Sequence, residues 1–161
     1  MIRVRSSLEV GDHTIIDEFC YFAADLRIGK YAHIAHAVTI LGGGNLCTIG
    51  DFTAIGPGVR IACASDDYAG GIAGPHIPRE FKGNPLSGDV IIGRHCVIGA
   101  NSVILPGSVI PDGVGIGALS LVRPKDRIVS YGLYAGCPIR LLRYRIRNEG
   151  LEERFKECSD L

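Results

Sequence analysis

Histidine is the side chain best suited to proton transfer at neutral pH, because its unperturbed pKa lies close to neutrality. The sequence contains five: His13, His33, His36, His76 and His95. His36 lies in the segment AHIAH between residues expected to face the core, so its imidazole should point outward. We interpret His36 as the first candidate for a general base, with surface or inter-subunit packing as the alternative. His76 is the rival, because Pro75 and Pro78 hold its backbone stiffly.

The remaining candidates are grouped around these two histidines. His33 is expected to assist His36 or to line a substrate pocket, whereas His13 and His95 are expected to be structural or solvated. Residues in the segment of His76 are expected to bind substrate: Asp66, Asp67, Arg79 and Asn84. The two carboxylates could orient a histidine or bind hydroxyls and an amine, and they would serve equally well as turn residues. No His, Cys or Asp spacing repeats as a ligand set, so no metal site is predicted.

The elements that must position these side chains follow a repeat of six residues. Isoleucine recurs at every sixth position between residues 92 and 121: Ile92, Ile98, Ile104, Ile110 and Ile116. Four places after each lies a small or polar residue or a valine: Cys96, Ser102, Ser108, Val114 and Ser120. A period of six fits neither an α-helix nor an isolated strand, and it is typical of a parallel β-helix with three short faces. The prediction is an all-β fold of about five coils.

The repeat covers residues 10–127 of a single domain, 1–161, and is interrupted twice. After Ile40 its phase shifts by three residues, which predicts a bulge at a corner. Between residues 66 and 90 the phase is lost in a Gly- and Pro-rich stretch that cannot continue the coil. A long loop in a regular scaffold is often functional. Residues 1–9 should cap one end, and the C-terminal segment 128–161 is predicted to contain a helix from Arg140 to Phe155.

Composition excludes several classes of protein. Seventeen basic and seventeen acidic side chains in 161 residues cancel, so neither nucleic acid nor a membrane surface is an expected partner. No apolar run approaches the roughly 20 residues of a membrane-spanning helix, and the N-terminus lacks the apolar stretch of a secretory signal. The six cysteines show no paired spacing, so we expect reduced packing residues in a cytoplasmic protein.

Three segments resemble the left-handed β-helix acyltransferases. The stretch IGRHCVIGANSVILPGSVI with IGALSLV, and the closing YAGCPIRLLR, resemble galactoside, maltose and serine acetyltransferases. KYAHIAHAVTI is similar to the histidine coil of UDP-N-acetylglucosamine acyltransferases and sugar-nucleotide N-acetyltransferases. The resemblance implies a left-handed β-helix and a homotrimer with active sites between subunits. It also implies transfer of an acyl group from coenzyme A or acyl carrier protein to an amine or hydroxyl.

The resemblance also assigns residues. His36 matches the family's catalytic-histidine coil, and Ala100 and Ala118 match positions that contact coenzyme A. Its phosphates would require cations, for which Arg123, Lys125 and Arg140 are the candidates. In the galactoside branch the base follows the coil that ends near residue 65, where this chain has Asp66–Asp67. His76 replaces that base only if its loop folds back into the cleft.

The hypothesis from the sequence is transfer of an acetyl group from acetyl-CoA to the amino group of a nucleotide-linked amino sugar used for bacterial surface polysaccharide. The first alternative is an O-acetyltransferase acting on a sugar hydroxyl. Alternatives of another class are a non-catalytic trimeric scaffold and a γ-class-like metal hydratase.

Overall fold

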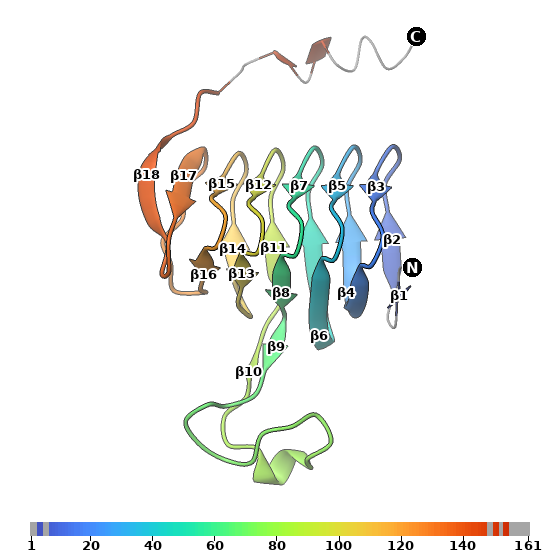
Figure 1. Cartoon of the computed structure of the whole chain (residues 1–161), viewed down its shortest axis with the longest axis vertical. Helices are drawn as coiled ribbons and strands as arrows, with labels where there is room; N and C mark the ends of the chain where they lie inside the picture. Colours follow the sequence, from blue (N-terminus) through green and yellow to red (C-terminus); the bar gives the residue numbers. More distant parts are fainter. Residues whose placement is uncertain (1–2, 5–6, 148–149, 152, 155–161) are drawn as a thin grey trace.

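The computed structural model describes residues 3–4, 7–147, 150–151, 153 and 154, and it is a left-handed parallel β-helix of about six coils (Figure 1). Each coil crosses three faces. Face 1 contains β2 (Leu8–Val10), the second halves of β4 (Tyr21–Ile28) and β6 (Thr39–Ile49), β11 (Val90–Ile92) and β14 (Val109–Ile110). Face 2 contains β3 (Ile15–Ile16), β5 (His33–Ile34), β7 (Ala54–Ile55), β12 (Val97–Ile98), β15 (Gly115–Ile116) and β17 (Gly132–Ala135). Face 3 contains β1 (Arg3–Val4), the first halves of β4 and β6, β8 (Arg60–Ala62), β13 (Val103–Ile104) and β16 (Leu121–Val122).

The strand register shows how the sequence repeat becomes a stack. Regular coils place residues 18 apart beside each other, as in the pairing of Ile15 with His33. The next step, from His33 to Ala54, is longer by the three residues of the phase shift. The step from Ala54 to Val97 contains the long interruption. Coils above and below an insertion therefore keep their alignment, and all added residues leave the stack at one corner.

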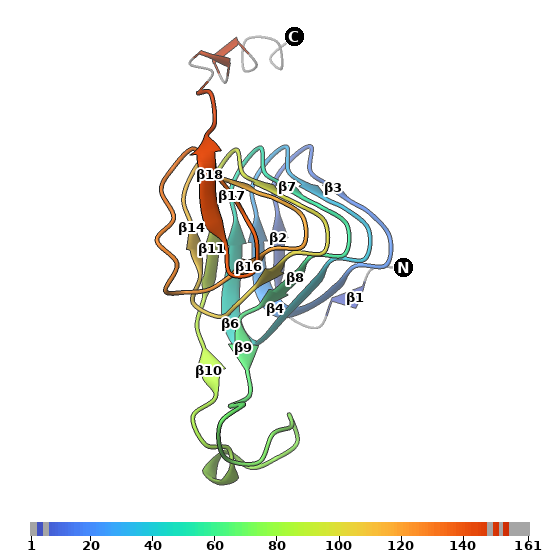
Figure 2. The same cartoon turned by 60° about the vertical axis from the view of Figure 1, so that its left-hand side comes forward.

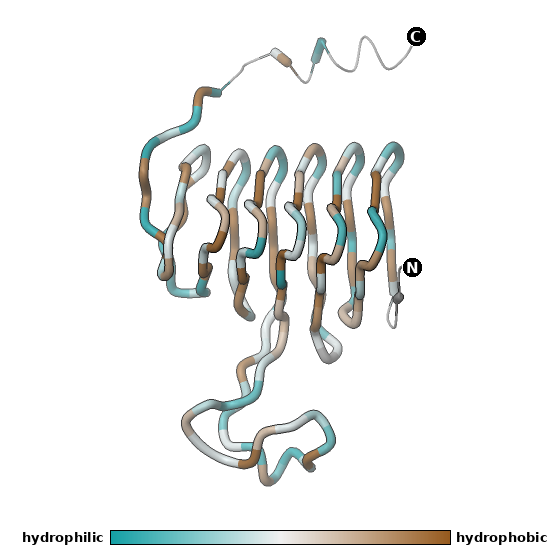
Figure 3. The backbone as a smooth tube through the Cα atoms, viewed as in Figure 1, coloured by the Kyte–Doolittle hydropathy of each residue, from teal (hydrophilic) through white to brown (hydrophobic). Residues whose placement is uncertain are grey.

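The core is a column of the inward-facing residues of every hexad, and Figure 3 shows the hydrophobic positions recurring coil after coil. The sixth-position isoleucines between residues 34 and 116 are almost completely buried. Small polar residues fill the tight space beside the turns because their hydroxyls satisfy turn carbonyls. Ser102 donates to Gly117 O at 3.0 Å, and Ser108 donates to Leu105 O at 2.7 Å. Burial raises the pKa of the Cys96 thiol to about 11, consistent with a packing role.

Both insertions leave the corner between faces 3 and 1. The smaller one, which we call the bulge, comprises residues 42–45 within β6, where the register with β4 shifts. The larger one, which we call the excursion, comprises residues 63–89 and projects away from the helix (Figures 1 and 2). Its two arms pair as the antiparallel strands β9 (Ala64–Ser65) and β10 (Leu86–Ser87), and its far end contains the short 3₁₀ helix η1 (Arg79–Phe81).

The predicted C-terminal helix is wrong over its first part. Residues Arg140–Tyr144 form the strand β18, antiparallel to β17. Hydrogen bonds to the free edge of the last coil outweigh a helical pattern of apolar residues that has no surface to pack against. Beyond residue 147, the described residues Leu151, Glu153 and Arg154 are helical, and the end of the predicted helix at Phe155 lies outside the described residues. In the described part of the chain, no helix is long and apolar enough to cross a membrane.

Candidate active site

The corner between faces 2 and 3 carries a continuous column of residues at equivalent turn positions. From the N-terminal coil onward the column contains Glu18, His36, Pro57, Ala100 and Ala118. Backbone hydrogen bonds connect successive turns: Gly58 N–H donates to His36 O at 3.1 Å, and Leu119 N–H donates to Ala100 O at 2.9 Å. The sequence-predicted base and the two predicted coenzyme A contacts therefore lie along one edge of the molecule.

His36 is exposed at this corner, and no hydrogen bond to its imidazole is found among the described residues. It lies two coils from Ala100, or roughly 10 Å at the usual spacing of about 4.8 Å between neighbouring strands. Beyond Pro57 the column contains only alanine, so the column itself carries no large side chain between His36 and Ala118, and Asn101 and Leu119 lie beside it. We call this column the narrow edge. Such an edge can accept an extended ligand against the backbone and present its end to a base.

Arg60 is a contributor to this corner that sequence reasoning missed. Its guanidinium donates to Ala37 O at 2.8 Å and to Gly58 O at 2.9 Å, joining the turns of two successive coils. Both turn residues have positive φ, as do the equivalent Asn101 and Leu119. Fixing these turns fixes the backbone direction of His36. Arg60 lies 23 residues after Ala37, whose carbonyl it contacts. This spacing could have been recognised in the sequence only by allowing for the three-residue phase shift, which places the two residues in adjacent coils.

His33 and the two remaining coil histidines have partners. His33 Nε2 lies 3.0 Å from Asp17 Oδ2 on the preceding coil, so its ring is oriented by a carboxylate. At the corner between faces 1 and 2, His13 and His95 belong to a stack of parallel rings with Tyr31 and Phe52. The expected structural role of His13 and His95 agrees with this stacking.

The other predicted substrate residues lie in the excursion, where the two aspartates organise its backbone. Asp66 Oδ2 accepts from Gly74 N–H at 2.9 Å, and its Oδ1 lies 3.3 Å from Lys82 Nζ. Asp67 accepts from Asn84 N–H at 2.9 Å and from Ala69 N–H at 2.8 Å. These two amides hold the pKa of Asp67 below its ordinary value.

His76 and Arg79 lie further out on the excursion, and both are exposed. No hydrogen bond or ion pair to either side chain is found among the described residues. Figure 2 shows the excursion projecting from the stack, and the strand pairing places it at the corner between faces 3 and 1. His36 lies at the corner between faces 2 and 3 of the same chain. The structure thus divides the predicted site residues into two sets, the corner column and the excursion.

Asn45 in the bulge is a second residue that sequence reasoning missed. Its Nδ2 donates to Gly42 O at 2.9 Å and Cys63 O at 3.0 Å, and it lies 2.9 Å from Ser87 Oγ. Asn45 therefore ties the bulge to both arms of the excursion at its base. The sequence places Asn45 and Ser87 42 residues apart, and only the shared corner of the two insertions could have suggested that they meet.

The predicted phosphate-binding cations lie near the C-terminal end of the helix. Arg123 forms a two-pronged interaction with Asp126, with contacts of 2.6 and 3.0 Å. Burial alone would raise the pKa of Asp126, but the Arg123 hydrogen bonds outweigh it and lower the pKa. Lys125 and Arg140 are exposed. In the described part of the chain, no group of three or more His, Cys, Asp or Glu residues is placed to hold a metal ion.

Comparison with known proteins identifies the class to which this fold and site belong. No family model matches the chain. The dTDP-4-amino-4,6-dideoxy-D-glucose acyltransferase of Escherichia coli is 34% identical over 158 residues, covering 95% of this chain and 80% of that protein. A lipopolysaccharide biosynthesis O-acetyl transferase assigned to Escherichia coli K12 is 29% identical, covering 76% of this chain and 59% of that protein.

A solved structure agrees over almost the whole chain. AntD, an N-acyltransferase from Bacillus cereus in complex with dTDP and 3-hydroxybutyryl-CoA, superposes with a TM-score of 0.89 at 33% identity. The match covers 99% of this chain and 88% of that one. A variant of the same enzyme, in complex with dTDP-4-amino-4,6-dideoxyglucose and coenzyme A, gives 0.85 at 31% identity, covering 99% and 87%.

The chain belongs to the hexapeptide-repeat acyltransferases with a left-handed β-helix, within the branch that resembles sugar and sugar-nucleotide acyltransferases. The prediction of an acyl-CoA-dependent enzyme is confirmed.

Proposed function

We propose that this protein transfers an acetyl group from acetyl-CoA to the amino group of a dTDP-linked 4-amino sugar. The observation that carries the proposal is the likeness over nearly the whole chain to two enzymes described with this kind of acceptor. The open corner column beside His36 supports it, because it offers the narrow edge that a pantetheine arm needs. The acceptor is of the class that the sequence predicted.

The reaction is a direct transfer in a ternary complex. The acceptor amine attacks the thioester carbonyl, the C–N bond forms, the C–S bond breaks, and coenzyme A leaves as a thiolate with the electron pair of the C–S bond. The amine loses one proton, for which His36 is the proposed acceptor because its imidazole is exposed and has no partner in the described residues. A backbone N–H stabilises the developing oxyanion. His76 is the second candidate for the base.

The assembly that we propose is a homotrimer in the cytoplasm with active sites between subunits. In that arrangement the excursion of one subunit faces the corner column of its neighbour. This pairing would unite the two sets of site residues that lie at different corners of one chain. The product would be an N-acetylated nucleotide sugar for a surface polysaccharide.

The test is coenzyme A formation, measured chromatographically with acetyl-CoA and a panel of acceptors. A dTDP-linked 4-amino sugar should be acetylated, and the corresponding 4-hydroxy sugar nucleotide should not. Free sugars test the alternative of an O-acetyltransferase. The similarity to the O-acetyl transferase of Escherichia coli K12 is the observation that favours this alternative. Turnover with hydroxyl acceptors alone would overturn the N-acetyltransferase proposal.

The donor position has its own test at Ala118. Ala118→Trp places a large ring on the narrow edge and should raise the KM for acetyl-CoA about tenfold or more, a loss of about 1.4 kcal/mol in binding. Ala118→Ser keeps the small size and should leave this KM unchanged. Equal KM values for the two variants would place the donor elsewhere.

A further inference from the structure

The excursion folds back on itself and forms a pocket with the bulge. The pocket has a volume of about 580 Å³, within the usual range for small-molecule sites. Ile77, Pro85 and Leu86 contribute apolar surface to its lining. Arg79 and Lys82 contribute two cations, and Asp66 is the one carboxylate of the lining residues, so the pocket carries a net positive charge.

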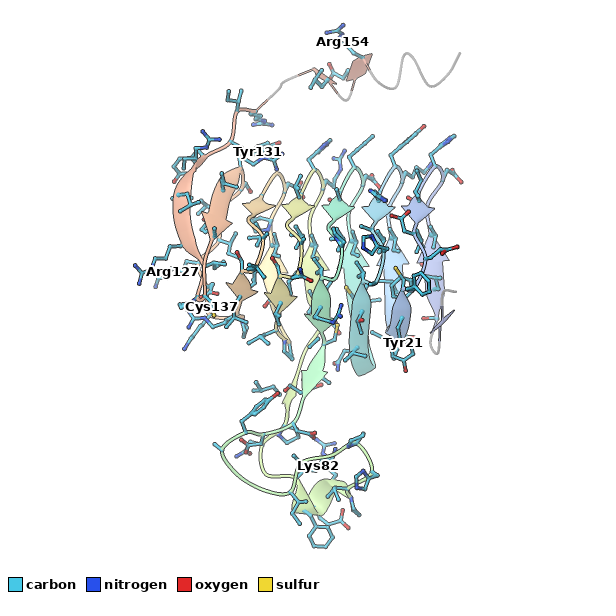
Figure 4. The ribbon with its side chains drawn as sticks, in the orientation of Figure 1. Tyr21, Lys82, Arg127, Tyr131, Cys137 and Arg154 are labelled. Atoms are coloured by element: carbon cyan, nitrogen blue, oxygen red, sulfur yellow. The ribbon has the colours of Figure 1, made fainter. Side chains whose placement is uncertain are left out.

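The two cations are held differently. Lys82 is fixed by Asp66 at 3.3 Å, and only 18% of its side chain is exposed. Figure 4 shows Lys82 within the loop of the excursion. Arg79 begins η1 and is exposed, and no partner for its guanidinium is found in the described residues. A positioned ammonium and an available guanidinium on one pocket are suited to an anion with several oxygens, because a guanidinium binds two phosphate oxygens at once.

Contacts within the chain hold the walls of the pocket in place. Asn45 joins the base of the excursion to the bulge, and Asp67 holds the backbone near Asn84. Gly71 and Gly83 cross so closely that a side chain on Gly71 would collide with the Gly83 backbone. These contacts lower the ordering cost that a loose loop would add to binding.

We propose that this pocket binds the diphosphate of the sugar-nucleotide acceptor, with Arg79 and Lys82 as its ligands and the apolar surface beside the nucleoside. The identity of the nucleotide rests on the proposed function. Coenzyme A also carries a diphosphate, but the cations predicted for its phosphates, Arg123, Lys125 and Arg140, lie near the C-terminal end of the helix and do not line this pocket.

The experiment is calorimetric titration of the full-length protein with dTDP and, separately, with coenzyme A. Arg79→Gln should weaken dTDP binding about tenfold or more and leave coenzyme A binding unchanged. Arg127→Gln is the matched control, because Arg127 is also exposed and lies near the C-terminal end of the helix, away from the excursion (Figure 4). The control should bind both ligands as the wild type does.

Two results would overturn the inference. One is unchanged dTDP affinity in Arg79→Gln, and the other is a loss of coenzyme A affinity in its place, which would make the pocket a donor site. The titration also separates this inference from the proposed reaction. Arg79-dependent dTDP binding without acetyl transfer to any amino sugar would support the pocket and defeat the proposed function. If acetyl transfer occurs and Arg79→Gln has the same KM for the sugar nucleotide as Arg127→Gln, the proposed function stands and the inference about the pocket fails.

Discussion

Two corners of the helix have the same turn geometry but carry different kinds of side chain. At the corner between faces 1 and 2, the column equivalent to that of His36 alternates in charge: Asp12, Lys30, Asp51, Arg94 and Asp112. Lys30 Nζ lies 3.4 Å from Asp12 Oδ2, and its backbone N–H donates to Asp51 at 2.8 Å. Arg94 N–H donates to Asp112 at 2.7 Å. Each coil thus provides a partner for the next.

The residues beside this charged column are also matched. His13 and Tyr31 stack with ring centroids 4.7 Å apart and planes within 5°, and Phe52 and His95 stack at 5.0 Å. At the corner between faces 2 and 3 the equivalent turns carry Phe19, Ala37, Gly58, Asn101 and Leu119, and in the described residues these form no stack of rings. The comparison teaches that the repeat determines where a side chain points, while its neighbours one coil away determine whether it remains available for chemistry.

The largest expected effect tests the availability of His36. His36→Ala should lower kcat about 10²- to 10⁴-fold, the usual contribution of a general base, with little change in thermal stability. His13→Ala, which removes an exposed histidine from the stacked corner, should leave kcat unchanged. Steady-state kinetics with acetyl-CoA and the amino sugar nucleotide provide the measurement. If His76→Ala loses the rate and His36→Ala does not, the base lies on the excursion.

The next effect tests the corner between faces 1 and 2, where charged pairs and stacked rings cover the turns. Gly113 has a φ of +74°, and a Cβ there would lie 2.6 Å from the Tyr131 ring. Gly113→Ala should therefore lower the free energy of unfolding by about 2–4 kcal/mol, from backbone strain and overpacking together. Gly44→Ala is the matched control: φ is +93° and nothing lies within 4 Å, so only about 1 kcal/mol is expected. Equal losses in urea unfolding would contradict a packing role for Tyr131.

A smaller effect is expected where the excursion joins the helix. Asn45→Ala leaves the carbonyls of Gly42 and Cys63 without their side-chain donor, a local cost of about 1–3 kcal/mol. Amide exchange over residues 63–89 should accelerate, and the acceptor KM should rise while the acetyl-CoA KM stays constant. Ser87→Ala removes only the contact between Asn45 and Ser87, so its exchange rates and acceptor KM should lie between those of the wild type and Asn45→Ala. A uniform increase in exchange across all coils would show that Asn45 stabilises the whole fold and not the excursion.

The smallest effect depends on pH. Amides of Asn84 and Ala69 lower the pKa of Asp67 below 3.8, so its stabilising contribution is fully present above that value. It is lost as pH falls through the lowered pKa, because protonation removes the charged acceptor. Amide protection at Asn84, corrected for intrinsic exchange, should hold at about pH 5 and decline as the pH is lowered below 3.8. In Asp67→Asn the protection should be weak throughout this range, and a wild-type protection that does not change with pH would contradict this role.

The repeat was sufficient to predict most of the fold. Inward isoleucines, small residues beside the turns, the interruption near residues 66–90 and an outward His36 all follow from a period of six, because each depends only on local spacing. The prediction of a C-terminal helix was wrong over residues 140–144, because their conformation depends on a tertiary contact and not on local spacing. Residues 140–144 are governed by the free edge of β17, which the local pattern cannot show.

What the tertiary structure alone decided is which residues meet across coils. The Asp17–His33 pair joins residues 16 positions apart in consecutive regular coils. The contacts from Arg60 to Ala37 and from Asn45 to Ser87 span 23 and 42 positions, and these residues meet only because the insertions leave the stack at one corner. The sequence by itself determined a solenoid with an exposed histidine and a long loop. Stacking then closed one corner with charges and rings, left another open beside His36, and built the excursion into a pocket, because contacts between coils depend on register and not on local pattern.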